Sequence, residues 1–85
     1  MKTHELSILQ AFADAIYNGD KTFELTENDR EYQKGDHIKF TVRNSLTLKQ
    51  INHALNDCEY EITYVLSGWG LKENYVVLAI KRLNI

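Results

Sequence analysis

The sequence predicts a small α+β domain in which a mostly antiparallel curved sheet, or a partly closed β-barrel, is flanked by one or two helices. Three observations support this fold class. The 85 residues suffice for a single core and therefore for one domain, residues 1–85. One segment repeats apolar residues at helical spacing. At least four short segments alternate or concentrate apolar residues as strands do, and a curved sheet packs them economically.

Residues 7–18 are predicted to form the first helix. Ser7 and Gln10 have the spacing of a capping box at its start. Asn18-Gly19 is typical of a left-handed C-cap at its end. The apolar positions between them predict one buried face, made by Leu9, Phe12, Ala13, Ile16 and Tyr17.

Residues 45–57 leave two alternatives, a second helix or an irregular loop. The helix would span residues 47–56, beginning at Thr47 with Gln50 in the capping-box position. Its apolar stripe would consist of Leu48, Ile51 and Leu55. The loop is favoured by the polar residues Asn52, Asn56 and Asp57.

Strands are predicted at residues 21–26, 37–43, 59–66 and 75–83. In the first, Phe23 and Leu25 point one way while Glu24 and its even-numbered neighbours point the other. The last is apolar on both faces at its start, which is typical of a central strand. In the third strand, alternation places four residues on one face: Tyr60, Ile62, Tyr64 and Leu66.

Composition narrows the classes of function and location. The net charge of −2 and pI near 5.9 argue against a nonspecific polyanion binder. One cysteine, Cys58, allows no intrachain disulfide and favours a reducing compartment, and no apolar segment predicts a leader or membrane span. We therefore expect a cytoplasmic protein without a membrane partner. We also expect no metal or cofactor, because metal-ligand spacing is absent among His4, His37 and His53.

The predicted site is centred on Gly19-Asp20-Lys21-Thr22-Phe23-Glu24, where the first helix passes into a strand. Lys21 and Glu24 are three residues apart, so a regular strand would place them on opposite faces. They share one cleft only if Lys21 lies in the turn before the strand or if a bulge intervenes. The alternative is a surface ion pair on an edge strand, which contributes little.

Gly19-x-Lys21-x-x-Glu24 resembles the signature of the ASCH (activating-signal-cointegrator homology) family, which has a PUA-like fold. The resemblance covers nearly the whole chain except roughly residues 44–58. The opening His4-Glu5-Leu6 is similar to the short, uncharacterised bacterial and phage branch. Further matching residues are Asn28-Asp29-Arg30, Tyr32, Gly35-Asp36, Ile62-Thr63-Tyr64, Gly70-Leu71 and Tyr75-Val76-Val77-Leu78.

The resemblance implies a small β-barrel flanked by helices, and a cleft that binds RNA, a nucleotide or a nucleoside. By position, Lys21 would meet a phosphate or a polar base edge, and Glu24 would accept a hydrogen bond. The family motif usually continues to an arginine, and Thr26 stands there instead. Arg30 would replace this cation only if the following loop folds back.

One branch of the family resembles an amidohydrolase that removes acyl groups from modified cytidine. In that branch a threonine is the nucleophile and the lysine is its base. Here the lysine position matches Lys21, but Glu24 stands at the threonine position, and Thr22 is out of register. A direct transfer of the mechanism therefore fails, and the enzyme remains an alternative hypothesis.

The remaining candidate ligand-binding residues lie outside the motif. Asn28 and Arg30 belong either to a structural turn or to a site where Arg30 meets an anion. Trp69, between two glycines, either plugs the open end of the barrel or offers a platform for a base, flanked by Lys72 and Tyr75. Besides binding and hydrolysis, a third hypothesis is a protein-interaction module that uses an exposed strand edge.

Overall fold

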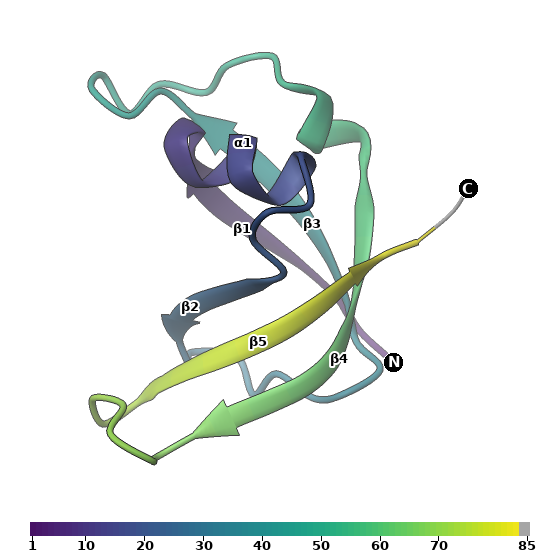
Figure 1. Ribbon diagram of the computed structural model, residues 1–85, viewed down its shortest axis with the longest axis vertical. Coiled ribbons are helices and arrows are strands. Elements are labelled where there is room, and N and C mark those ends of the chain that lie inside the picture. Colours follow the sequence, from purple (N-terminus) through teal and green to yellow (C-terminus); the bar gives the residue numbers. More distant parts are fainter. Residues whose placement is uncertain (84–85) are drawn as a thin grey trace.

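The computed structural model describes residues 1–83 and confirms the predicted fold class. Over these residues a five-stranded mixed sheet curls into a half-barrel that is flanked by one helix (Figure 1). Strand order across the sheet is β1-β3-β4-β5-β2, with β1 and β3 parallel and the other three pairs antiparallel. The elements are β1 (Thr3–Leu9), α1 (Gln10–Tyr17), β2 (Phe23–Glu27), β3 (His37–Arg43), the 3₁₀ turn η1 (Ala54–Asp57), β4 (Glu59–Ser67) and β5 (Tyr75–Arg82).

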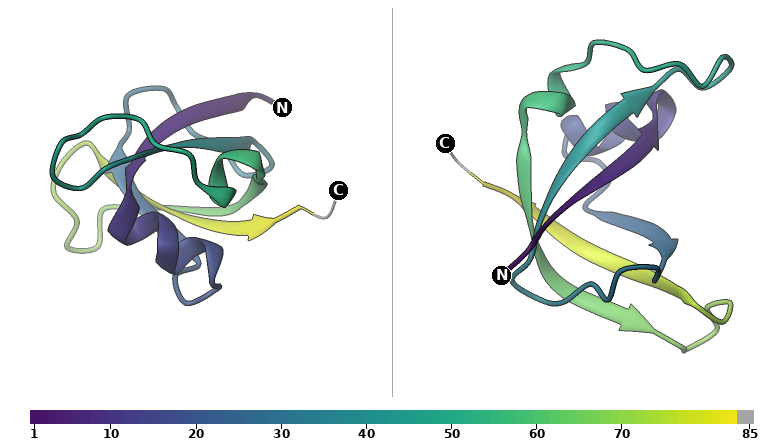
Figure 2. Two further views of the ribbon diagram at one scale, coloured as in Figure 1. Left: turned by 90° about the horizontal axis from the view of Figure 1, so that it is seen from above. Right: turned by 180° about the vertical axis from the view of Figure 1, so that it is seen from behind.

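One hydrophobic core fills the concave side of the sheet, and α1 lies beside the end of this core (Figure 2). Each fully buried branched aliphatic side chain stabilises the fold by roughly 1.5–3 kcal/mol. Because β1 and β2 are the two edges of the sheet, the half-barrel stays open between them. The largest fully buried side chains are Ile38, Leu55, Ile62, Leu78, Val42 and Val76.

The start of the first helix was predicted wrongly. Residues 3–9 form strand β1, in which His4, Leu6 and Ile8 alternate into the core. Parallel pairing with β3 therefore overrides the capping-box spacing, and the helix begins at Gln10 without a side-chain cap. The buried face of α1 is also narrower than predicted, since only Ala13 and Ile16 are buried within the helix.

Of the two alternatives for residues 45–57, the structure has the irregular loop, apart from the single 3₁₀ turn η1. The segment before it turns back on itself, because the Asn44 side chain accepts hydrogen bonds from the N–H groups of Leu46 and Thr47. This local pairing competes with helical bonding. Leu48, expected in the apolar stripe, is exposed and has a left-handed φ of 61°.

β4 changes the direction of its side chains part-way along. A register shift between Ile62 and Tyr64 is a β-bulge. Tyr60 and Ile62 therefore face the core, whereas Tyr64 is 60% exposed on the outer face. The predicted single face containing Tyr60, Ile62, Tyr64 and Leu66 is thus corrected, because the alternation is broken by one extra residue.

No helix among the described residues is both long and apolar enough to span a membrane. Residues 1–83 also contain no group of three or more histidine, cysteine, aspartate or glutamate side chains placed to hold a metal ion.

Candidate functional site

The C-terminus of α1 fixes the backbone at Lys21. Gly19 has a left-handed φ of 84°, and its N–H donates to the carbonyl of Ile16 at 3.1 Å. Both Asp20 and Lys21 donate their N–H groups to the carbonyl of Ala15 at 3.0 Å. This arrangement is a Schellman cap, which satisfies the helix-end carbonyls and holds Lys21 in the turn before β2.

The position of Lys21 in this turn brings its side chain to Glu24. Lys21 Nζ donates to Glu24 Oε1 at 2.5 Å, and both side chains are largely shielded from water. The same amino group lies 4.8 Å from the centre of the Phe12 ring and 5.2 Å from that of Phe23. The carboxylate and the two rings hold the amino group in place by ion pairing and cation–π attraction.

Lys21 and Thr22 line a hollow of about 400 Å³ between the end of α1 and the end of the sheet. Lys81 and Arg82 of β5 also line this hollow, and because side chains alternate along a strand, the Arg82 guanidinium lies on this side and the Lys81 amino group on the opposite face. Ligand pockets in proteins have volumes of about 300–1,000 Å³, so the hollow has room for a small ligand. The other lining residues are Ile16, Tyr17, Asn18, Gly19, Tyr60 and Ile80.

Tyr60 lies opposite Arg82 in the β4–β5 register and lines the same hollow. Burial raises the pKa of Tyr60, although the nearby Arg82 lowers it. A tyrosine phenol is neutral near pH 7, so its hydroxyl can donate. No buried side-chain oxygen or nitrogen of the described residues is left without a hydrogen-bond partner, and Tyr60 lines the hollow, where its hydroxyl can meet a ligand.

The sequence did not identify Tyr60, Lys81 or Arg82 as site residues. Tyr60 has the alternation of a core position, and Lys81-Arg82 resembles a solvated strand end. Arg82 instead lies 5.1 Å from the centre of the Tyr17 ring at the end of α1. Only the β4–β5 register and the packing of α1 bring these residues to Lys21. In the sequence, the one signal for them is the pair of basic residues at the end of a predicted strand.

Four predicted site residues lie at the far end of β2 instead. The N–H of Asn28 donates to the carbonyl of Asn74 at 2.7 Å, which places Asn28 beside the β4–β5 hairpin. Lys72 lies 5.7 Å from the centre of the Tyr75 ring in this hairpin. Trp69 at its tip is 92% exposed, which excludes the barrel-plug alternative. The five residues of β2 separate Thr22 from Asn28, so their Cα atoms lie roughly 20 Å apart along the extended chain.

Arg30 belongs to neither group. Its Nη1 donates to the backbone carbonyl of Glu5 in β1 at 2.7 Å, and its Nε lies 3.3 Å from Asp29 Oδ1. The loop after β2 therefore folds back, but onto β1 and not into the hollow at Lys21. Asp29 also accepts from the Tyr32 hydroxyl at 3.4 Å, so these residues fasten the loop to the sheet edge.

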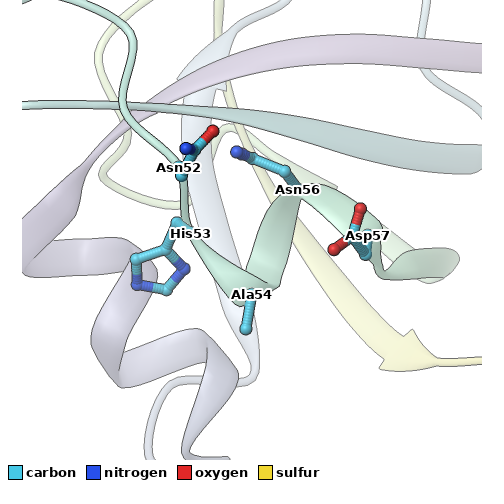
Figure 3. Close-up of a pocket in the computed structure, with 5 residues that line it drawn as sticks. All are labelled: Asn52, His53, Ala54, Asn56 and Asp57. Atoms are coloured by element: carbon cyan, nitrogen blue, oxygen red, sulfur yellow. The ribbon is translucent and has the colours of Figure 1, made fainter.

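A second hollow, of about 370 Å³, lies at η1 (Figure 3). His53 points towards α1, where its Nε2 lies 2.7 Å from Asp14, while its Nδ1 accepts from the N–H of Leu55. Asn56 accepts from the N–H of Val42 and donates to the carbonyl of Ile51. The side chains of His53 and Asn56 in this hollow thus hold η1 against α1 and β3.

Comparison with known proteins identifies the family. Residues 3–80 match the family described as "Domain of unknown function (DUF3850)". The chain belongs to the DUF3850 family. The structure is similar to "Crystal structure of hypothetical protein PH0355", with a TM-score of 0.61 and 16% identity over 98% of this chain and 100% of that one. At this identity the likeness shows a shared fold. No curated protein matches the sequence.

The DUF3850 match contains the whole Gly19–Glu24 stretch and ends at Ile80. Lys21 acts as a hydrogen-bond donor in this site, since its amino group is hydrogen-bonded to Glu24. No hydroxyl within residues 1–83 hydrogen-bonds to this amino group. The site as it stands therefore presents cations and a phenol, and it does not pair Lys21 with a nucleophile.

Proposed function

We propose that this domain binds a nucleotide, a nucleoside or the end of an RNA strand in the hollow lined by Lys21, Tyr60 and Arg82. One observation carries the proposal. The end of β5 delivers Arg82 to the same hollow as Lys21, and the Tyr60 phenol lines this hollow beside them. Cations around a neutral donor suit a phosphate attached to the sugar of a nucleoside.

Each side chain then has a separate role. Arg82 presents a planar guanidinium suited to two phosphate oxygens, and the Tyr17 ring limits its motion. Lys21 has N–H donors beyond the one given to Glu24, and these face the ligand. The Tyr60 hydroxyl donates to a sugar or base oxygen.

The resemblance to the ASCH family supports the same class of ligand. In this chain Thr26 replaces the arginine that usually ends the motif, and Arg82 supplies a guanidinium at the hollow from another strand. The acidic net charge favours a short ligand over long duplex. The buried free thiol of Cys58 fits a reducing, cytoplasmic location, which we propose as well.

Isothermal titration with nucleoside monophosphates, and with short RNA carrying a terminal phosphate, tests the proposal. We expect Arg82→Ala to weaken binding at least about tenfold, because a charged hydrogen bond contributes about 1.5–3 kcal/mol. Lys39→Ala, which removes an exposed lysine on β3, is the matched control. Equal affinity of the wild type and Arg82→Ala for every ligand, or no binding at all, would contradict the proposal.

A further inference from the structure

The convex side of the sheet carries an unusual concentration of exposed apolar side chains. On β2, β5 and β4, residues in register form adjacent rows, with Phe23 beside Ala79 and Tyr64, and then Leu25 beside Val77 and Leu66. Tyr75 lies opposite Glu27 in the next row. We call this surface the outer face, and its large side chains are Phe23, Leu25, Tyr64, Leu66, Tyr75 and Val77.

These side chains are accessible to solvent. Phe23 is 45% exposed, Leu25 is 50% exposed and Tyr64 is 60% exposed. The three strands lie side by side in Figure 1, and α1 packs at the other end of the half-barrel, against β1, β3 and η1. Contiguous exposed apolar surface of this kind marks a site of interaction more often than isolated apolar residues do.

The hairpin at the end of the outer face adds a further aromatic ring at a conformational cost. Gly68, Trp69 and Gly70 all have left-handed φ values, of 70°, 52° and 88°. For tryptophan this conformation is strained, by about 1–3 kcal/mol. The hairpin nevertheless holds the indole in water, 92% exposed, beside a small hollow lined by Leu25, Leu71, Lys72 and Tyr75.

Each end of the outer face carries a lysine that can contact a phosphate. Lys72 lies over the Tyr75 ring at one end, and Lys81 is exposed at the other, where Lys21 also contacts Phe23. The carboxylates on these strands are at the margins. Glu27 ends β2, and Glu61 lies opposite Lys81, so the aromatic middle carries no charged side chain.

We infer that the outer face binds a single strand of nucleic acid, whose bases stack on Phe23, Tyr64, Tyr75 and Trp69 while Lys72 and Lys81 contact its phosphates. The inference rests on the proposed function and extends the binding site from one hollow to the whole outer face. A flexible strand can follow a convex surface, whereas a rigid partner touches only part of it. Aromatic platforms with flanking cations are the usual means of binding single strands.

Trp69 is the one tryptophan in the sequence, so its selectively excited fluorescence reports directly on stacking. We titrate the full chain with oligouridylates and oligoadenylates of one to about eight nucleotides, and with the matching deoxyoligonucleotides. We expect quenching and an affinity that rises with length. Tyr64→Ala should weaken binding of the longest oligomer at least about fivefold. Leu46→Ala, which removes an exposed leucine away from the outer face, should not change it.

Two further variants refine the test. Trp69→Gly removes the ring and suits the left-handed backbone, so it should weaken binding while melting at the same or a higher temperature than the wild type. Lys72→Ala should reduce the slope of log affinity against log salt by about 0.7. Tighter binding of RNA than of DNA would identify RNA as the ligand, and equal binding would indicate single strands in general.

The failure of this inference is distinguishable from failure of the proposed function. If mononucleotides and oligomers bind with the same affinity, and Arg82→Ala weakens this binding while Tyr64→Ala does not, only the inference about the outer face is overturned. No binding of any nucleotide or oligomer would overturn both. Sedimentation that shows a dimer abolished by Tyr64→Ala, without oligomer binding, would assign the outer face to a second copy of the chain.

Discussion

Tyr60 and Arg82 lie directly opposite each other on β4 and β5, at the end of the sheet where α1 also ends. The core and the candidate site meet at this pair. The Tyr60 side chain is buried against the core, while its hydroxyl reaches the hollow that Arg82 lines. One antiparallel register therefore places a neutral donor and a guanidinium together, beside the lysine that the helix cap delivers.

Tyr60→Phe isolates the contribution of the hydroxyl to ligand binding. The ring and its packing against Phe40, at 5.7 Å between ring centres, should remain. Because the hydroxyl lines the hollow while the ring packs in the core, the free energy of unfolding should change by less than about 1 kcal/mol. Nucleotide affinity should fall by about fivefold in a calorimetric titration. A large loss of stability with unchanged affinity would show that the hydroxyl serves the fold.

The Lys21–Glu24 pair should stabilise the domain as well as shape the site. Glu24→Leu would leave the Lys21 amino group between two phenyl rings without its carboxylate, and we expect a loss of about 1–3 kcal/mol. A double-mutant cycle with Lys21→Met, followed by urea unfolding, separates the pair from the effects of each side chain. The expected coupling is about 1 kcal/mol, and additive effects of the two changes would contradict it.

Gly19 is required by the left-handed C-cap of α1. Gly19→Ala should destabilise the domain by about 1 kcal/mol, since alanine is strained at a φ of 84°. Gly19→Asn should cost less, because asparagine tolerates this conformation. Thermal unfolding followed by circular dichroism compares the two variants. Equal melting temperatures for the alanine and asparagine variants would indicate that the cap relaxes into another conformation.

Stability should depend on pH through Asp36. This buried carboxylate accepts from His4 Nε2 at 2.8 Å and from the N–H groups of Lys2 and Gln33. The hydrogen bond from His4, with the two backbone bonds, lowers the pKa of Asp36 below its usual 3.8 despite burial. The stabilisation is therefore complete above pH 3.8 and is lost as the pH falls through the lower native pKa. Asp36→Asn should reduce the dependence of the free energy of unfolding on pH in this acidic range, as measured by urea unfolding at several pH values.

The fold was largely predictable from local patterns. Clean alternation located β3 at residues 37–43, and the two-sided apolar run at residues 75–83 located the central strand β5. The predictions failed where pairing at a distance overrides local preference. β1 resembles a helix start but pairs with β3. Asn44 caps a turn instead of a helix, and Asn56 accepts from the N–H of Val42 in β3.

The candidate site was predictable in part. Gly19, Lys21 and Glu24 could be placed together because a helix cap and a short turn are local features. Asn28, Trp69, Lys72 and Tyr75 lie at the other end of β2, since a five-residue strand carries the chain away from Lys21. No local pattern reveals that Arg82 meets Lys21 across more than sixty residues of sequence.

The sequence by itself determined the class of fold, the helix cap at Gly19 and the position of Lys21 next to it, because each depends on residues within a few positions. The tertiary structure alone decided which cations share the hollow with Lys21 and that β4 turns Tyr64 outward at its bulge. Both depend on strand register. Register is set by the packing of the whole core, and a shift of one residue would move every side chain to the opposite face.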